Sequence, residues 1–189
     1  MLKILHLDTE TTGRNAQANA VHQLSGGIEI EGELVEEFDF KVKPYPTAVI
    51  SNEALKIAKV TVEQIMMYED GMSVIRKLCN ILEKHIDLSN ARDKMFLSGY
   101  GCAHFDNPFF NSFFEQNGCG KYKSYFWTAT IDTQVLAANA LRYERNAMGD
   151  FKMETVAKRF NIDVDTTLLH NAAYDWKVSR LIYHALNKK

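Results

Sequence analysis

The chain contains 189 residues, 46% of them hydrophobic and 24% charged, enough for one globular domain with a substantial core. No apolar run approaches the ~18 residues of a membrane span and the N-terminus lacks a signal-peptide layout, which argues against a membrane protein. The net charge of −2 does not by itself indicate a nucleic-acid binder. We expect a single cytoplasmic domain over residues 1–189. Cys79, Cys102 and Cys119 have no metal-ligand spacing and cannot all be bridged among themselves, which fits a reducing compartment.

The first third of the chain predicts strands. Lys3–Leu7 is a short, mostly apolar run typical of a strand covered on both faces. Gln23–Ile30 and Leu34–Lys43 also read as strands, joined by a hairpin at Glu31–Glu33. Three consecutive strands indicate that one edge of the sheet is antiparallel.

Helix signals follow. Ser51 can cap a short helix that ends at Ile57 or Ala58, and Thr61–Gln64 has the form of a capping box. Apolar residues at helical spacing over Ser73–Ile86 predict an amphipathic helix packed on the sheet. A polar linker at residues 88–93 comes next.

The second half alternates strand and helix. Pro108 suits the first turn of a helix capped by Asp106 or Asn107, and the phenylalanines after it form a stripe expected in the core. The remaining predicted elements are the strands Met95–Gly99 and Tyr125–Ile131 and helices from Asp132 to about Leu141, over Met153–Phe160 and over Asn171–Leu186. This order predicts an α/β fold in which helices flank a mixed sheet.

Two acids follow the first strand. Because side chains alternate along a strand, Asp8 and Glu10 project from the same face, where their charges repel unless a cation lies between them. Oxygen-only ligands favour Mg²⁺ or Mn²⁺ over zinc. A strand end with solvated acids remains an alternative. The turn over residues 11–13 contains Gly13, which allows a ligand to approach the backbone closely.

His170 and Asp175 form the second informative pair. On one helix they would lie roughly 140° apart and could not reach a common point. If His170 lies in the loop before the helix and Asp175 in its early turns, both can face one cleft. A loop position also leaves the imidazole free to move as a substrate arrives.

These residues resemble the three motifs of the DEDDh (DnaQ-like) 3′-to-5′ exonucleases, the group that includes the proofreading epsilon subunit of bacterial DNA polymerase III. The matching residues are Asp8-Thr-Glu10, His104-Phe105-Asp106, and His170 with Asp175, supported by the stretches at 50–55, 132–137 and 157–162. The resemblance implies a ribonuclease H-like fold and hydrolysis of phosphodiester bonds from the 3′ end of single-stranded or frayed DNA, which releases nucleoside 5′-monophosphates.

The resemblance also implies roles for residues. Two divalent cations, Mg²⁺ or Mn²⁺, would be held by four acids: Asp8, Glu10, Asp106 and Asp175. His170 would act as general base on the attacking water, for which an imidazole near its ordinary pKa is suited. The terminal nucleotide would contact four further residues: Thr11, Thr12, Gly13 and Phe105.

The chain departs from the family pattern at two positions. Cys102 stands where many members have asparagine, and Ala58 where a histidine is frequent. Neither residue replaces an expected metal ligand, so both departures concern substrate contacts. We expect Cys102 to be a packed thiol.

Other polar residues near the motifs have structural interpretations. We expect Asp132 to be a helix cap, His6 a structural histidine with satisfied hydrogen bonds, and His104 an outward-facing neighbour of Asp106.

Alternative functions remain open. The motifs do not separate DNA from RNA, so an exoribonuclease that trims RNA 3′ ends is the rival enzyme. A non-catalytic module that binds nucleic acid or a polymerase is disfavoured because all four acids and His170 are present. A DNA polymerase or a repair protein is the candidate partner. A free-standing repair or nucleotide-recycling enzyme is an equal expectation, because the chain stops at Lys189, just after the last predicted helix.

Overall fold

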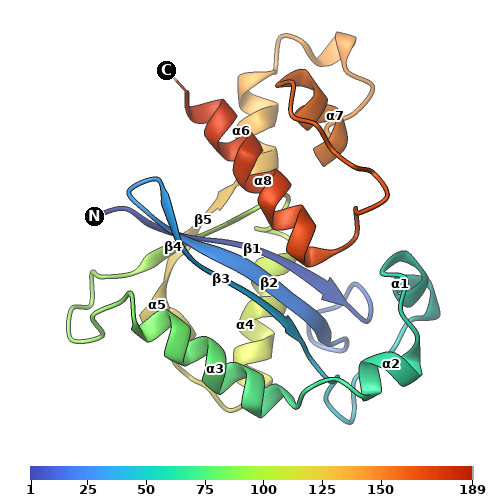
Figure 1. The fold of residues 1–189 in the computed structure, drawn as a ribbon, viewed down its shortest axis with the longest axis vertical. Helices are drawn as coiled ribbons and strands as arrows, with labels where there is room; N and C mark the ends of the chain where they lie inside the picture. Colours follow the sequence, from blue (N-terminus) through green and yellow to red (C-terminus); the bar gives the residue numbers. More distant parts are fainter. Residues whose placement is uncertain (189) are drawn as a thin grey trace.

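The structure, a computed structural model, describes residues 1–188 (Figure 1). Within these residues one five-stranded sheet has the order β3-β2-β1-β4-β5. Its strands are β1 (Lys3–Thr11), β2 (Val21–Ile30), β3 (Glu33–Lys41), β4 (Met95–Gly99) and β5 (Phe126–Asp132). The helices are α1 (Asn52–Ile57), α2 (Val62–Met66), α3 (Gly71–Glu83), α4 (Asp106–Gln116), α5 (Tyr122–Tyr125), α6 (Thr133–Ala140), α7 (Met153–Arg159) and α8 (Ala172–Asn187), with a 3-10 turn at Arg145–Ala147.

The sheet is mixed, as the sequence predicts. β1 pairs antiparallel with β2, and β2 antiparallel with β3, whereas β4 runs parallel to β1 and β5 parallel to β4. The β2–β3 hairpin turns at Glu31 and Gly32, which have φ values of 51° and 90°. Positive φ at both positions matches the right-handed twist of the strands. The antiparallel edge is therefore confirmed, and β1 lies at the centre of the sheet.

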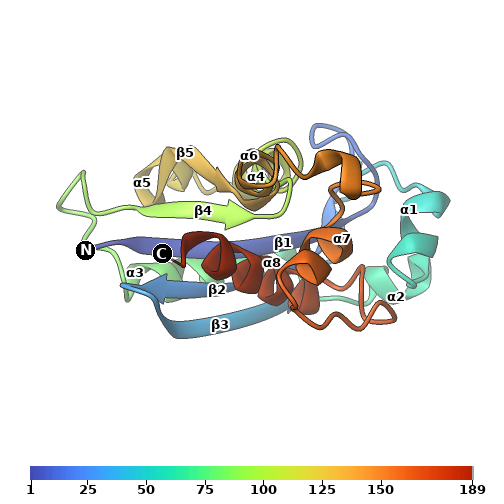
Figure 2. The same ribbon diagram turned by 90° about the horizontal axis from the view of Figure 1, so that it is seen from above.

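Helices cover both faces of the sheet. α3, α4 and α5 lie on one face, and α6, α7 and α8 on the other (Figure 1). α1 and α2 lie beyond the end to which β1 points (Figure 2). Their predicted caps are confirmed, because the Ser51 side chain accepts from the Ala54 N–H and both hydrogen bonds of the Thr61–Gln64 capping box form. No helix within residues 1–188 is long and apolar enough to cross a membrane.

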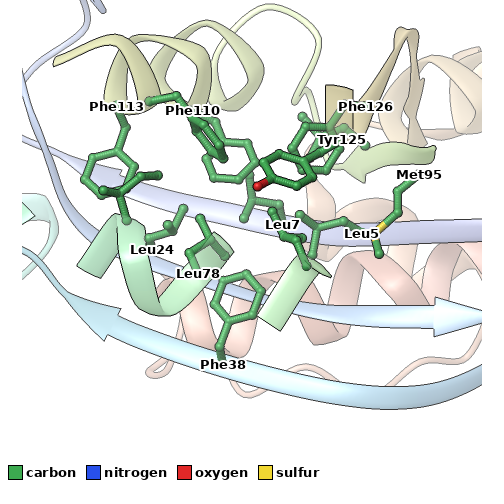
Figure 3. Packing of buried hydrophobic residues seen from close by; sticks show 14 of the residues in the cluster. Leu5, Leu7, Leu24, Phe38, Leu78, Met95, Phe110, Phe113, Tyr125 and Phe126 are labelled. Atoms are coloured by element: carbon green, nitrogen blue, oxygen red, sulfur yellow. The ribbon is translucent and has the colours of Figure 1, made fainter. Parts of the chain in front are cut away.

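The larger core lies between the sheet and α3 and α4 (Figure 3). Leu5 and Leu7 of β1 and Leu78 of α3 are buried there. The phenylalanine stripe of α4 is confirmed as core: its members Phe109, Phe110, Phe113 and Phe114 are each 3% exposed or less. A smaller core joins α6, α7 and α8. Because odd-numbered residues of β1 face α4, its even-numbered residues face α8.

Several elements differ from the sequence prediction. The helix predicted over Ser73–Ile86 is α3 over Gly71–Glu83, because the Asp70 side chain accepts from the Met72 N–H and so starts the helix earlier. β1 continues to Thr11, since the ladder with β2 runs on past Leu7 and pairs Asp8 with Ser25 and Glu10 with Gln23. A short helix, α5, precedes β5. α4 begins at Asp106, with Phe105 at the N-cap position, so the predicted cap by Asp106 or Asn107 is wrong. The Asp106 carboxylate binds β1 instead, and the Asn107 amide donates to the Thr130 hydroxyl.

Candidate active site

A cleft of about 560 Å³ opens where β1, α1, α4 and the start of α8 meet. Its lining contains eight of the nine site residues predicted from the sequence: Asp8, Glu10, Thr11, Gly13, Phe105, Asp106, His170 and Asp175. These residues come from three separate parts of the chain, residues 8–13, 105–106 and 170–175. The fold therefore brings the three motifs to one place.

Three carboxylates converge in this cleft. Asp8 and Glu10 share the face of β1 that α8 covers, and Asp175 lies in the first turn of α8. One oxygen from each of the three lies within 4.8 Å of the others. Asp175 is placed there because the Asn171 side chain accepts from the Ala173 N–H and so starts α8 just before it. The prediction that Asp8 and Glu10 share a face is confirmed.

Asp106 approaches the same cleft from the opposite side of the sheet. It is 4% exposed, and its Oδ1 accepts from the Thr9 N–H at 2.9 Å and from the Thr9 hydroxyl at 2.6 Å. Thr9 stands between Asp8 and Glu10 in β1. These two hydrogen bonds fix the fourth acid relative to the strand that carries the first two.

Burial disfavours the charged forms of all four acids, and repulsion from the other site acids adds to this at Asp8 and Glu10. Burial first, and then the neighbouring carboxylates, raise the pKa of Asp8 well above its usual value and that of Glu10 to about 8. Burial also raises the pKa of Asp106 to about 7, against the hydrogen bonds from Thr9, and that of Asp175 to about 6. Lys41 opposes the shift at Glu10. Such a cluster is electrostatically costly unless a cation neutralises it.

The donor set fits a divalent cation. All four acids offer oxygen, the ligand atom that Mg²⁺ and Mn²⁺ prefer. Asp175 Oδ2 accepts the His170 N–H at 3.0 Å, whereas its buried Oδ1 has no hydrogen-bond partner within residues 1–188. A buried oxygen without a partner costs free energy, and a bound cation would supply that partner.

His170 lies in the loop before α8, as the sequence analysis expects. Its backbone has a φ of 63° and its side chain is exposed at the cleft. Two contacts hold the preceding segment: Lys59 Nζ donates to the Thr167 carbonyl at 2.8 Å, and the Asp165 N–H donates to the Tyr174 hydroxyl. The loop that carries His170 is therefore anchored by its backbone, while the His170 imidazole stays exposed to solvent.

The residues at the turn after β1 lie partly in the cleft and partly in the protein interior. Thr11 lines the cleft and donates its hydroxyl to the Gly13 carbonyl at 2.6 Å. A Cβ at position 13 would collide with the Asn19 side chain, which explains the glycine. Thr12, by contrast, is 0% exposed and does not line the cleft, because its hydroxyl donates to the Val49 carbonyl. The structure thus places Thr12 as an anchor of the turn.

The cleft also contains residues that sequence reasoning did not select: Thr9, Arg14, Asn19, Ser51, Glu53, Ala54, Ile57, Tyr100 and Gly101. Arg14 brings a guanidinium to a site otherwise rich in acids. Its position next to Gly13, in the turn expected to approach a ligand, could have identified Arg14 as a site residue. Ser51 and Glu53 belong to the 50–55 stretch that supports the family resemblance.

Two of the three structural interpretations of polar residues are supported, those of Asp132 and His104. The Asp132 carboxylate accepts from the Gln134 and Val135 N–H groups, which makes it the cap of α6. It also accepts from the Gly101 and Ala103 N–H groups in the turn before α4.

The two histidines differ in exposure. His104 is exposed. His6 is buried, as expected, with Nε2 at 3.4 Å from Glu29 Oε2. Neither ring nitrogen has a hydrogen-bond partner within residues 1–188, so the expectation that His6 is satisfied is wrong.

The two departures from the family pattern lie outside the lining of the cleft. Cys102 is 0% exposed, and burial raises the pKa of its thiol, so it is a packed thiol as expected. Ala58 is half-buried at the C-cap of α1. Neither Cys102 nor Ala58 lines the cleft.

Comparisons with known proteins agree with this geometry. The profile of the RNase_T exonuclease family matches residues 5–183. Among solved structures, Escherichia coli exonuclease I in complex with a dT13 oligonucleotide has 19% identity and a TM-score of 0.75, over 98% of this chain and 40% of that one. A product-bound exonuclease I structure has 17% identity and a TM-score of 0.74, over 98% and 43%. This chain thus spans about two fifths of the length of the exonuclease I chains.

No curated protein sequence matches the chain. The structural likeness establishes the fold, a ribonuclease H-like sheet flanked by helices. The family profile covers nearly the whole chain, and members of the family use divalent metal ions. The chain therefore belongs to the RNase_T exonuclease family, the DEDDh-type 3′-to-5′ exonucleases of the DnaQ-like superfamily.

Proposed function

We propose that this domain hydrolyses phosphodiester bonds from the 3′ end of single-stranded or frayed DNA and releases nucleoside 5′-monophosphates. The observation that carries the proposal is the convergence of carboxylate oxygens from Asp8, Glu10 and Asp175 within 4.8 Å of one another. Asp106 and His170 line the same cleft. This is the set of groups that a two-metal phosphodiesterase needs.

The four acids would hold two divalent cations, Mg²⁺ or Mn²⁺. Asp8, Glu10 and Asp175 form the tight group, and Asp106 is held beside it by Thr9. When bound, such cations polarise the phosphate and stabilise the charge on the leaving 3′ oxygen. The acids themselves orient the ions through a rigid strand and two helices, which keeps the site preorganised.

His170 would take the proton from the attacking water. Its exposed side chain borders the cleft, so the imidazole can exchange that proton with solvent after each cycle. The hydrogen bond from the His170 N–H to Asp175 joins the backbone of the proposed base to one of the proposed metal ligands. The backbone of His170 is therefore held next to Asp175, while the imidazole remains free to rotate.

The substrate end would lie along the β1 turn. Thr11 and Gly13 line the cleft there, and Phe105 presents a ring that packs on Phe109 at 5.0 Å between centroids. A supported aromatic ring at a cleft edge can stack on a nucleobase. Arg14 is the guanidinium available for a phosphate. Exonuclease I has been solved with bound oligodeoxynucleotides, which supports DNA as the polymer.

The test uses 5′-labelled single-stranded DNA and RNA of one sequence, with Mg²⁺, Mn²⁺ or EDTA. We expect a ladder that shortens from the 3′ end on DNA, with nucleoside 5′-monophosphates as products. EDTA and Glu10→Gln should abolish the ladder. The matched control is Glu33→Gln, the same change at an exposed position of the neighbouring sheet edge, which should leave the rate unchanged.

Two results would redirect the proposal. Faster cleavage of the RNA strand would replace DNA by RNA as the substrate, the rival that the motifs leave open. No cleavage of either strand by folded protein with either metal would favour a non-catalytic nucleic-acid or polymerase-binding module. A specific likeness to the epsilon subunit, a polymerase or repair partner, the cytoplasmic location and the single domain over residues 1–189 stay predictions. Lys189 lies outside the described residues.

A further inference from the structure

Two cysteines that are distant in the sequence lie side by side on the face opposite α8. Cys79 is on α3 and Cys119 follows α4, and their Sγ atoms are 3.6 Å apart. Both side chains are half-buried. The third thiol, Cys102, is fully buried elsewhere.

Each of the two thiols is held by well-packed backbone. Cys79 follows Leu78, which is buried in the main core, and the Cys119 N–H donates to the Phe114 carbonyl at 2.9 Å. Gly118, with a φ of 67°, turns the chain so that Cys119 folds back toward α3. The proximity of the two sulfurs is therefore a property of the fold and does not depend on a flexible loop.

The pair is open to small molecules. Cys79 and Cys119 both line a pocket of about 460 Å³, together with Arg76, Glu83 and Lys121 among others. None of the described residues that line this pocket lines the candidate active-site cleft. A reagent can thus reach the thiols without competing with a nucleic-acid substrate.

We propose that Cys79 and Cys119 are an oxidative modification site, which closes to an intramolecular disulfide between α3 and the segment after α4. The two sulfurs must approach each other by about 1.5 Å, from 3.6 Å to the ordinary S–S bond length. Rotation of the cysteine side chains covers such a distance. The 40-residue separation conceals the pair in the sequence.

The oxidant is a peroxide, and the reaction balances with hydrogen peroxide. The Cys119 thiolate attacks one peroxide oxygen, the O–O bond breaks, and the released hydroxide takes up the thiol proton to leave as water. The Cys79 sulfur then attacks the Cys119 sulfur, the S–O bond breaks, and a second water leaves with the Cys79 proton. Two thiols and one peroxide thus become one disulfide and two waters. Burial raises the pKa of the Cys79 thiol, and the reaction gives the same disulfide and two waters whichever sulfur reacts first.

The bond should stabilise the domain without altering the candidate active site. Closing a loop of 40 residues restricts the unfolded chain, which corresponds to a Tm rise of about 10 °C. Thiol reductants should reverse the rise. Since the two pockets share no described residue, the cleavage rate on DNA should not change.

The test treats the reduced, folded protein with hydrogen peroxide and measures intact mass, a non-reducing tryptic map and Tm. Trypsin leaves Cys79 in residues 78–84 but leaves Cys102 and Cys119 together in residues 95–121, so the map is made on Cys102→Ser as well as on the natural chain. We expect the loss of two hydrogens, a cross-linked pair of these two peptides in both proteins, and a Tm rise that dithiothreitol reverses.

Cys79→Ser and Cys119→Ser are the controls, and neither should lose two hydrogens or gain Tm with peroxide. If a variant fails to fold, the intact mass, peptide map and Tm of the natural chain still decide the test. Oxygen addition to single cysteines without the cross-linked peptides, or a disulfide between two chains, would overturn the proposal.

Discussion

A buried carboxylate outside the cleft offers a direct test of the electrostatics of this fold. Glu29 of β2 is 2% exposed and lies under α8. Its Oε2 accepts from Arg180 Nε at 2.6 Å and lies 2.7 Å from His184 Nε2. His6 of β1 is close by, at 3.4 Å. One carboxylate thus ties α8 to the two central strands, and α8 carries Asp175.

The magnitude follows from the pKa of Glu29. Burial alone raises it, but the side chains of His6, His184 and Arg180 lower it to about 2, from 4.5. That shift corresponds to about 3 kcal/mol of stability. Because the folded-state pKa is depressed, the contribution is fully present above pH 4.5 and is lost as the pH falls toward 2. Glu29→Gln should therefore lower the free energy of unfolding by about 3 kcal/mol at pH 7, and progressively less in acid.

Urea unfolding followed by circular dichroism measures this difference at pH 7 and again near pH 3. Glu33→Gln, at an exposed position of β3, is the matched control and should change stability by less than about 0.5 kcal/mol. Equal stability of Glu29→Gln and the natural chain at pH 7 would refute the reasoning. A deficit that does not shrink between pH 7 and pH 3 would also refute it, because the loss would then come from packing.

Three further outcomes are expected. Mg²⁺ at ten times its Kd should stabilise the natural chain by about 1.4 kcal/mol, and Asp175→Asn should remove most of this gain in a thermal melt; an equal gain in the variant would contradict the assigned ligand. Asp132→Ala removes the acceptor of four backbone N–H groups and should lower the free energy of unfolding in urea by about 2 kcal/mol, with slower cleavage. Unchanged activity would mean that the turn before Asp106 keeps its conformation without Asp132. Lys59→Met removes the hydrogen bond to the Thr167 carbonyl and should lower kcat about five-fold with little change in KM. A change confined to KM would mean that Lys59 contacts the substrate and does not act through the His170 loop.

Local rules were sufficient for much of the molecule. The alternation of a strand put Asp8 and Glu10 on one face, and the 3.6-residue period put the phenylalanines of α4 in the core. The capping side chains of Ser51, Thr61 and Asp132 accept from backbone N–H groups no more than three residues away. Such caps can therefore be predicted from the sequence alone. The family resemblance added the family itself, which the profile match over residues 5–183 confirms.

Contacts between distant segments needed the tertiary structure. No period in the chain indicates that Asp106 hydrogen-bonds Thr9, that Thr12 points inward, or that Arg14 borders the cleft. The proximity of Cys79 to Cys119 likewise arises only when α3 and α4 pack on the same face of the sheet. The physical reason is range: strand and helix periodicities act over a few residues, whereas the meeting of two segments is set by the packing of whole elements.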